Sequence, residues 1–277
     1  MIKISAIQPI SNAVSLGYPF IEAILSVLPI VDEFLINDGG SKDKTSFYLK
    51  KLKKTFPDKI RLFNKPFYPC VFWEAIDECI EFLISQANGD WLVEVQGDEI
   101  WHESNISKAK QTIGKASEEG YNSIRTICHW VRFERIDPYE YRNVRIVRKL
   151  KNLRSYDCGD DFQIGPHGEA AKGFTVSNVP PELVTDLTWF NLSGVVFPGN
   201  ALKRAEKIAT FFAKEEKERQ QTWQDFKSRP LSKQEPDAEV IKQLPALVQG
   251  LAKFDKYKVR NELFDKQYLK KLTGLSY

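Results

Sequence analysis

Two short acidic stretches at the ends of apolar runs carry the residue types best suited to chemistry. The first, "FLINDGGSKDKT" at residues 34–45, changes from apolar side chains to Asp38, two glycines and Ser41. A carboxylate at the end of a strand can accept hydrogen bonds from a nucleobase or ribose, and glycines let the backbone approach a ligand closely. A plain strand-to-helix turn, in which Ser41 caps the next helix and Asp43 lies in its first turn, uses the same residue types. Both interpretations stay open.

The second stretch, "ANGDWLVEVQGDE" at residues 87–99, places Asp98 and Glu99 directly after another apolar run. Two carboxylates at that place are costly unless they are solvated, hydrogen-bonded or bound to a cation. A divalent cation that bridges them to a diphosphate would satisfy both charges. The alternative is an exposed acidic loop.

The elements that must position these stretches alternate between strands and helices. Apolar runs and helical spacing predict strands over 2–7, 33–37, 59–63 and 90–96, and helices over 19–28, 44–56 and 71–84. Such alternation is typical of parallel βαβ units with helices on both faces of the sheet. Ligands of these sheets bind beyond the carboxyl ends of the strands, which here carry "QPISN", "NDGGSKD" and "QGDEIWHE".

The composition and charge are those of a globular protein without a marked partner. The chain has 277 residues, 42% of them hydrophobic, and its 40 Lys and Arg against 37 Asp and Glu leave a net charge of +3. This balance gives no support for a nucleic-acid partner. The four cysteines form no CxxC pair, the N-terminus lacks a signal-peptide pattern, and no apolar run approaches the roughly 20 residues of a membrane helix. We therefore predict a cytoplasmic protein without a spanning segment.

Three stretches taken together resemble a known family. "ISAIQPISNA", "LGYPFIEAILSVLPIVDEFLINDGGSKDKT" and "ANGDWLVEVQGDEIWHE" resemble the nucleotide-binding half of family-two glycosyltransferases of the GT-A fold. The resemblance is to a bacterial and archaeal subgroup with a tyrosine-proline near the first helix and a "QADE…HE"-like metal motif. It covers residues 2–103 and continues more weakly to about residue 165. It implies an α/β, Rossmann-like, mixed but mostly parallel sheet flanked by helices.

The resemblance also implies a division of the chain and a donor site. Residues 1–103 would be the nucleotide-sugar-binding half of the domain and 104–199 the acceptor-side half, and the helical pattern after residue 200 predicts that 200–277 is a C-terminal helical appendage. Asp38 would contact the base of a nucleotide diphosphate sugar, and Asp98 would coordinate Mn²⁺ or Mg²⁺ on the diphosphate. The other donor-binding residues implied are Gln8, Pro9, Asn12, Gly39, Ser41, Gln96 and Gly97. Gln96 stands where the family's metal motif has its first aspartate, which removes one charge from the site.

Transfer with inversion, which the resemblance implies, needs a carboxylate as general base on the acceptor hydroxyl. Candidates lie in "SYDCGDDFQIGPHGEA", where Asp161 is the first choice, Asp160 the second and Glu169 the third. An ordinary polar loop explains the same segment. Glu99 and Glu103 are expected either to assist the metal or acceptor or to be solvated loop carboxylates.

One departure from the family concerns histidine. The family often has a histidine in a "HYGWVR"-like stretch near residue 190, but this chain has none after His167. His102, His129 and His167 are each expected to be hydrogen-bonded structural residues rather than ligands. The departure leaves open a catalytically degenerate protein that binds nucleotide sugar or a protein partner without turnover. A sugar nucleotidyltransferase ranks lower, because "QPISNAVSLG" lacks a glycine-rich loop with a basic residue.

The remaining segments favour plain structural roles. In "RNVRIVRKLKNLR" the basic residues alternate with apolar ones, which is typical of a half-exposed strand, although they could instead face a phosphate or an anionic acceptor. From residue 200 the pattern is helical and rich in lysine. A homodimer contact and a peripheral contact at the inner face of a membrane, near a saccharide or glycolipid acceptor, are hypotheses for this part. A solvated helix face is the simpler interpretation.

Overall fold

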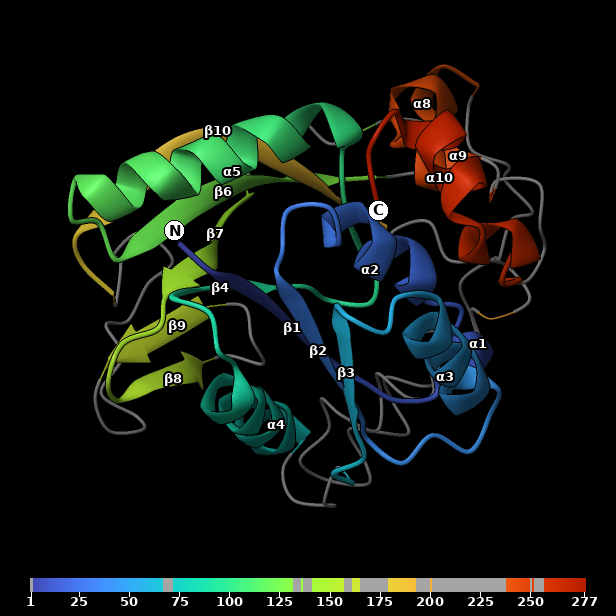
Figure 1. Ribbon diagram of the computed structural model, residues 1–277, viewed down its shortest axis with the longest axis horizontal. Helices are drawn as coiled ribbons and strands as arrows, with labels where there is room; N and C mark the ends of the chain where they lie inside the picture. The colour runs from blue at the N-terminus through green and yellow to red at the C-terminus, as the bar shows by residue number, and fades with distance from the viewer. Residues whose placement is uncertain are drawn as a thin grey trace, which may run out of the picture.

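The structure is a computed structural model that describes residues 2–66, 72–131, 136, 141–156, 161–164, 179–192, 200, 238–249, 251 and 257–277. Its centre is an eight-stranded sheet in the order β3-β2-β1-β4-β7-β6-β10-β5 (Figure 1). The strands are β1 (Ile4–Ile10), β2 (Glu33–Asp38), β3 (Ile60–Phe63), β4 (Trp91–Glu94), β5 (Glu99–Trp101), β6 (Ser123–Trp130), β7 (Tyr141–Arg148) and β10 (Glu182–Asn191). A separate two-stranded sheet pairs β8 (Leu153–Tyr156) with β9 (Asp161–Ile164).

Most neighbouring strands of the large sheet are parallel. β3, β2, β1 and β4 all run in one direction, and β10 runs parallel to β6. β7 is antiparallel to both β4 and β6, and β5 is antiparallel to β10. The α/β class and the mixed, mostly parallel sheet predicted from the sequence are therefore confirmed.

Helices cover both faces of the sheet, as the burial of successive strand residues requires. Ala6 and Phe34 belong to one buried cluster, whereas the next residues, Ile7 and Leu35, belong to another. The first cluster lies under α1 (Ala13–Leu16), α2 (Phe20–Val27), α3 (Thr45–Thr55) and α5 (Glu103–Glu118), and the second lies under α4 (Phe72–Gln86) and the β8–β9 pair. Burial on both faces explains why these strands read as continuous apolar runs.

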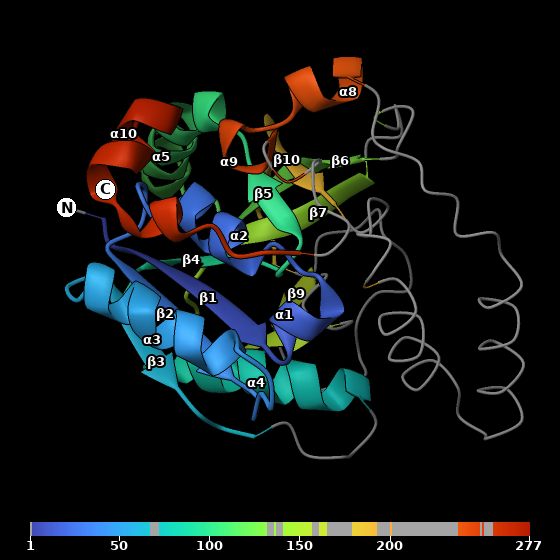
Figure 2. The same ribbon diagram turned by 90° about the vertical axis from the view of Figure 1, so that its right-hand side faces the viewer.

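The described part of the C-terminal segment packs on the first of these faces. It contains α8 (Ala238–Gln243), α9 (Ala246–Gln249), the short 3₁₀ turn η2 (Asn261–Phe264) and α10 (Lys266–Thr273). Leu247, Leu263 and Leu269 join the same buried cluster as the strands, and α9 lies beside α2 (Figure 2). The division into residues 1–103, 104–199 and 200–277 stays a prediction, and most of residues 200–237 lies outside the described residues.

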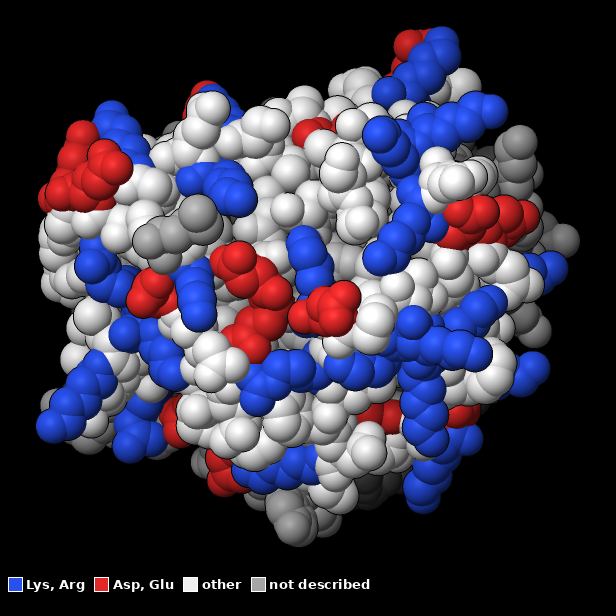
Figure 3. Space-filling model, in the orientation of Figure 1, with Lys and Arg blue, Asp and Glu red and all other residues white. Residues whose placement is uncertain are grey.

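The charged side chains of α10 face away from this core. Leu269 is fully buried, whereas Lys270 is exposed, so the apolar side of the helix is used in packing. On the face drawn in Figure 3, Lys and Arg are interspersed with Asp and Glu. Within the described residues, no helix is both long enough and apolar enough to cross a membrane.

Candidate functional site

The carboxyl ends of β1, β2 and β4 meet at one edge of the sheet. Ile10 is paired with Asp38 at the ends of β1 and β2, and the Gly39 amide donates to the Ile10 carbonyl at 2.8 Å. On the other side of β1, the Val95 amide donates to the Ile7 carbonyl at 3.1 Å. The two acidic stretches are thus brought to the same edge, on either side of the first strand, as parallel pairing predicts.

Asp38 is held in one orientation by the loop that follows it and by the first turn of α3. Its side chain is almost buried, Oδ1 accepts a hydrogen bond from the Ser41 amide at 2.9 Å, and Oδ2 accepts one from the Ser46 hydroxyl. The intervening Gly40 has a φ of 87°, a left-handed conformation that glycine adopts without strain. Because each carboxylate oxygen has two lone pairs, Asp38 keeps acceptor capacity for a further ligand.

Asn12 connects the loop after β1 to the loop after β2. Its backbone amide donates to Ser41 Oγ at 2.9 Å, and its Oδ1 accepts from the Lys42 amide at 2.8 Å. Ser15 extends the connection, because its amide donates to Asp43 Oδ2 at 2.7 Å. The first two strands therefore end in a single, mutually bonded structure.

The predicted helix cap at Ser41 is wrong. α3 begins at Thr45, and Lys44 occupies the capping position without a side-chain hydrogen bond. Ser41 is used instead by Asn12, and Asp43 precedes the helix and accepts from the Thr45 amide at 2.8 Å. Contacts between the two loops have replaced the local cap that the sequence suggested.

Gln8 is an unusual buried residue of β1. Its side chain is fully buried, and neither amide atom has a hydrogen-bond partner among the described residues. An unpaired buried amide costs on the order of 1–3 kcal/mol, so such a group is commonly satisfied by a ligand or an ordered water. Pro9, which was also predicted to bind the donor, is the next residue of β1 and pairs with Asn37 of β2.

Gly97 and Asp98 stand close to the end of β1. A Cβ atom added to Gly97 would lie 3.5 Å from Tyr18 Cβ and 3.6 Å from Ile10 Cδ1, which places this turn against the first strand. Asp98 is 6% exposed, and its carbonyl accepts from the Leu192 amide at 2.9 Å. The Gln96 amide donates to Glu99 Oε2 at 3.3 Å, which closes the turn.

Glu99 has a structural role that the sequence did not reveal. Arg145 on β7 donates to both of its carboxylate oxygens, at 3.0 and 2.6 Å, and also to Glu94 Oε2 at 2.9 Å. All three side chains are at most 1% exposed, and the Arg145 guanidinium lies 5.0 Å from the centre of the Trp189 ring. The expectation that Glu99 is a solvated loop carboxylate is therefore wrong, whereas its assistance to a metal or an acceptor stays a prediction.

The buried Glu99–Arg145 pair affects the pKa of a nearby cysteine, Cys128. Burial raises the pKa of the Cys128 thiol, the carboxylates of Glu99 and Asp98 raise it further, and Arg145 lowers it. Cys128 is fully buried, so this thiol stays protonated and unreactive.

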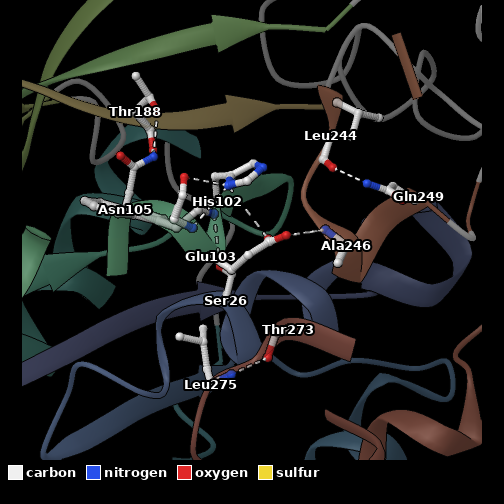
Figure 4. Close-up of polar contacts among 12 residues, drawn as sticks. Ser26, His102, Glu103, Asn105, Thr188, Leu244, Ala246, Gln249, Thr273 and Leu275 are labelled. Carbon is white, nitrogen blue, oxygen red and sulfur yellow. Dashed lines mark hydrogen bonds and ion pairs between the residues drawn. The ribbon is translucent and has the colours of Figure 1, made fainter. Parts of the chain in front are cut away.

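The residues after β5 connect the sheet to the C-terminal segment, as Figure 4 shows. His102 caps α5, because its Nδ1 accepts from the Ser104 amide at 3.2 Å. Glu103 accepts from the Ala246 amide of α9 at 3.3 Å, and Asn105 donates to Thr188 on β10. The structural role expected for His102 is confirmed. Glu103 joins two elements rather than lying free in a loop.

The side chains at this edge of the sheet suit a divalent cation only in combination with a phosphate. Within the described ranges, no three His, Cys, Asp or Glu side chains are grouped as a metal cage. Mg²⁺, however, is commonly held by one or two carboxylates together with substrate phosphates and water. Asp98 at the edge of the sheet fits that mode, whereas Glu94 and Glu99 are committed to Arg145.

The predicted general bases are not tested by these contacts. Asp161 begins β9 and pairs with Tyr156 of β8, in the small sheet beside α4. Asp160, Glu169 and His167 lie outside the described residues. The strand predicted for the basic stretch is confirmed at β7, but its half-exposed character is wrong, because residues 143–147 are all buried. Arg145 is among them, and Arg148 donates to backbone carbonyls.

Comparisons with known proteins give similarity of fold only. No protein-family model matches the chain, and no curated protein matches it in sequence. The chain is similar to the crystal structure of Staphylococcus aureus TarS, with 13% identity, a TM-score of 0.45 and coverage of 98% of this chain. It spans 55% of that TarS chain. For a structure of TarS 1–349 the values are 16% identity, a TM-score of 0.44, and coverage of 98% of this chain and 88% of that one.

A third similar structure is the mannosyltransferase PcManGT from Pyrobaculum calidifontis, solved with GDP-Man and Mn²⁺. Its identity is 12%, its TM-score is 0.44, and the match covers 77% of this chain and 64% of that one. All three TM-scores lie below 0.5, so these similarities carry no argument about function.

Proposed function

We propose that the protein is a glycosyltransferase that moves a sugar from a nucleotide diphosphate sugar to a saccharide or glycolipid acceptor. The observation that carries the proposal is the placement of Asp38 and Asp98 at one carboxyl edge of the sheet, with Gln8 buried two residues before the end of β1. Open parallel sheets bind their ligands at this edge. The edge offers an oriented carboxylate at Asp38, which matches a base or ribose, and a carboxylate at Asp98, which suits a cation on a diphosphate.

The donor's nucleoside would bind beside β1 and β2. Asp38, fixed by Ser41 and Ser46, would accept a hydrogen bond from the base or ribose. Gln8 would supply a donor and an acceptor that the described residues leave unpaired. Gly39 and Gly40 would let the backbone approach the nucleoside. Asn12 would hold the loop after β2 in place through its hydrogen bond with the Lys42 amide.

The diphosphate and the sugar would lie towards the turn after β4. A Mn²⁺ or Mg²⁺ ion bound there would stabilise the negative charge on the departing diphosphate. Asp98 would hold that ion, and Gln96 stands two residues away with a neutral side-chain oxygen. Asp161, followed by Asp160 and Glu169, is our proposed general base, which would take the proton of the acceptor hydroxyl as the sugar is transferred with inversion.

A catalytically degenerate protein is the second candidate, and two features favour it. Gln96 replaces a carboxylate of the metal motif, and the adjacent Glu99 is occupied by Arg145. Such a protein would bind the nucleotide sugar without transferring the sugar.

Turnover distinguishes these candidates. The protein is incubated with UDP-, GDP-, CDP- and dTDP-sugars, each with Mn²⁺ or Mg²⁺ and a mixture of saccharide acceptors, and released nucleoside diphosphate is measured. The transferase predicts metal-dependent release from one donor, lost in Asp98→Asn and kept in the control Asp186→Asn, whose carboxylate is exposed. Nucleotide binding without release would favour the degenerate protein. Release of pyrophosphate would contradict both and indicate a nucleotidyltransferase.

A further inference from the structure

Asn200 joins three segments that are distant in the sequence. Its side chain is 6% exposed, and its Nδ2 donates to the Ser15 carbonyl at 3.0 Å and to the Val14 carbonyl at 3.5 Å. Its Oδ1 accepts from the Tyr257 amide at 2.9 Å. The amide is therefore used at both ends, between the short helix α1 and the C-terminal segment.

The contacts with α1 stabilise the end of this short helix. The last carbonyls of a helix lack partners within the helix, and a helix of four residues is not stable alone. Asn200 supplies a donor for the Ser15 carbonyl at 3.0 Å, and it adds a longer contact of 3.5 Å to the Val14 carbonyl, which also accepts from the Gly17 amide at 3.3 Å. Its approach is close: a Cβ atom at Gly17, which ends α1 with a φ of 74°, would lie 2.8 Å from Asn200 Cβ.

The other side of Asn200 is anchored in the core. The Tyr257 hydroxyl donates to Glu22 Oε2 of α2 at 2.8 Å, and its ring packs edge-on against Phe20 at 6.1 Å between centres. Both Tyr257 and Glu22 are buried. Asn200 is therefore bonded to a buried residue that is itself hydrogen-bonded to α2.

The beginning of α1 is bonded to the loop that carries Asp38. Besides Asn12 and Ser15, which bond to Ser41, Lys42 and Asp43, the Val14 amide donates to Thr45 Oγ1 at 3.2 Å. A shift of α1 would therefore be transmitted to Ser41, whose amide orients the Asp38 carboxylate.

We propose that Asn200 is a positioning residue for the donor site, which fixes α1 and, through α1, the loop of Asp38. This inference rests on the proposed function, because it assigns the C-terminal segment a part in setting donor affinity. Asn200 does not contact the donor. It acts through hydrogen bonds at the far end of the four-residue helix.

The test uses the full chain and separates the two ends of the Asn200 amide. Asn200→Asp keeps the acceptor for Tyr257 and removes the donors to α1, and Asn261→Asp is the matched control, since Asn261 bonds to Lys51 away from α1. Hydrogen exchange of residues 11–17 and 39–45 should be about three- to tenfold faster in Asn200→Asp, the factor expected for the loss of the one hydrogen bond of normal length, to the Ser15 carbonyl. The control should exchange like the wild type. Asn200→Ala introduces no buried charge and keeps the test available if the aspartate variant does not fold.

Donor binding gives the second readout. For the nucleotide that the wild type binds, the Kd or donor KM should rise by a similar factor in Asn200→Asp, with kcat little changed. Faster exchange confined to residues 11–17, or an unchanged donor Kd in a folded variant, would overturn the proposal. A wild type that binds no nucleotide would instead overturn the proposed function, while exchange of residues 39–45 would still decide whether Asn200 fixes the loop.

Discussion

Replacing Arg145 by methionine should destabilise the protein strongly. Arg145 is the shared partner of Glu94 and Glu99, and all three side chains are at most 1% exposed. Methionine fills much of the same volume but leaves two buried carboxylates without their cation. Loss of one partner from a buried ion pair typically costs about 3–5 kcal/mol, which is a large part of the roughly 5–15 kcal/mol that stabilises a domain.

A half-exposed arginine, Arg154, provides a control for the loss of unfolding free energy. Arg154 on β8 pairs with Glu81 at 3.1 Å, but its side chain is 38% exposed, so Arg154→Met should cost less than about 1 kcal/mol. Urea unfolding followed by tryptophan fluorescence measures both variants, and equal m-values would allow their midpoints to be compared.

The pH dependence tests the cause of the loss. In Arg145→Met the buried carboxylates of Glu94 and Glu99 lose the Arg145 cation, which should raise their pKa values, so protonation should restore part of the stability as the pH falls from about 8 to about 5. Adding Glu99→Gln to Arg145→Met should also recover stability, because it removes one uncompensated charge. If Arg145→Met costs no more than Arg154→Met, the buried cluster does not have the role described here.

Two further predictions concern buried groups outside this cluster. Burial raises the pKa of the Cys79 thiol to about 12, so iodoacetamide should modify Cys79 only after unfolding, as peptide mass spectrometry can measure; modification of the folded protein would contradict its burial. Burial also raises the pKa of Glu22, so the folded state binds this proton more tightly than the unfolded state, and the Glu22 contribution to stability should fall as the pH rises from about 4.5 through the folded pKa. Glu22→Gln should flatten that part of the stability–pH curve, and an unchanged curve would exclude Glu22 as its source.

The local pattern predicted the first half of the fold well. Residues such as Ile7 and Leu35 lie in continuous apolar runs because both faces of the sheet are covered, and a period near 3.6 marks α3 and α4. The edge of the sheet that carries Asp38 and Asp98 followed from the direction of parallel strands. Boundaries shifted by a few residues, as at β1, which ends at Ile10 rather than at residue 7.

Long-range contacts were beyond the same reasoning. Arg145 meets Glu94 across 51 residues because β7 pairs antiparallel with β4, and nothing local specifies that neighbour. Alternation of basic and apolar residues indicated a strand but not which arginine would be buried. The sequence suggested that Ser41 caps the next helix. Its actual partner, the Asn12 amide, is 29 residues away and leaves no local signal. A contact between Asn200 and Ser15, across 185 residues, has no signal in the sequence.

The most direct test of the donor site is calorimetric titration of UDP, GDP, CDP and dTDP, each with and without Mn²⁺, into the wild type, Asp98→Asn, Asp38→Asn and the control Asp186→Asn. We predict one-site binding of one nucleotide that is strengthened by Mn²⁺ in the wild type and in Asp186→Asn. Affinity should fall about tenfold or more in Asp38→Asn, because a hydrogen bond to a charged group is lost, and Asp98→Asn should lose the effect of Mn²⁺. Binding that is the same in all four proteins, or no binding of any nucleotide, would contradict the assignment of this edge of the sheet as a nucleotide diphosphate site.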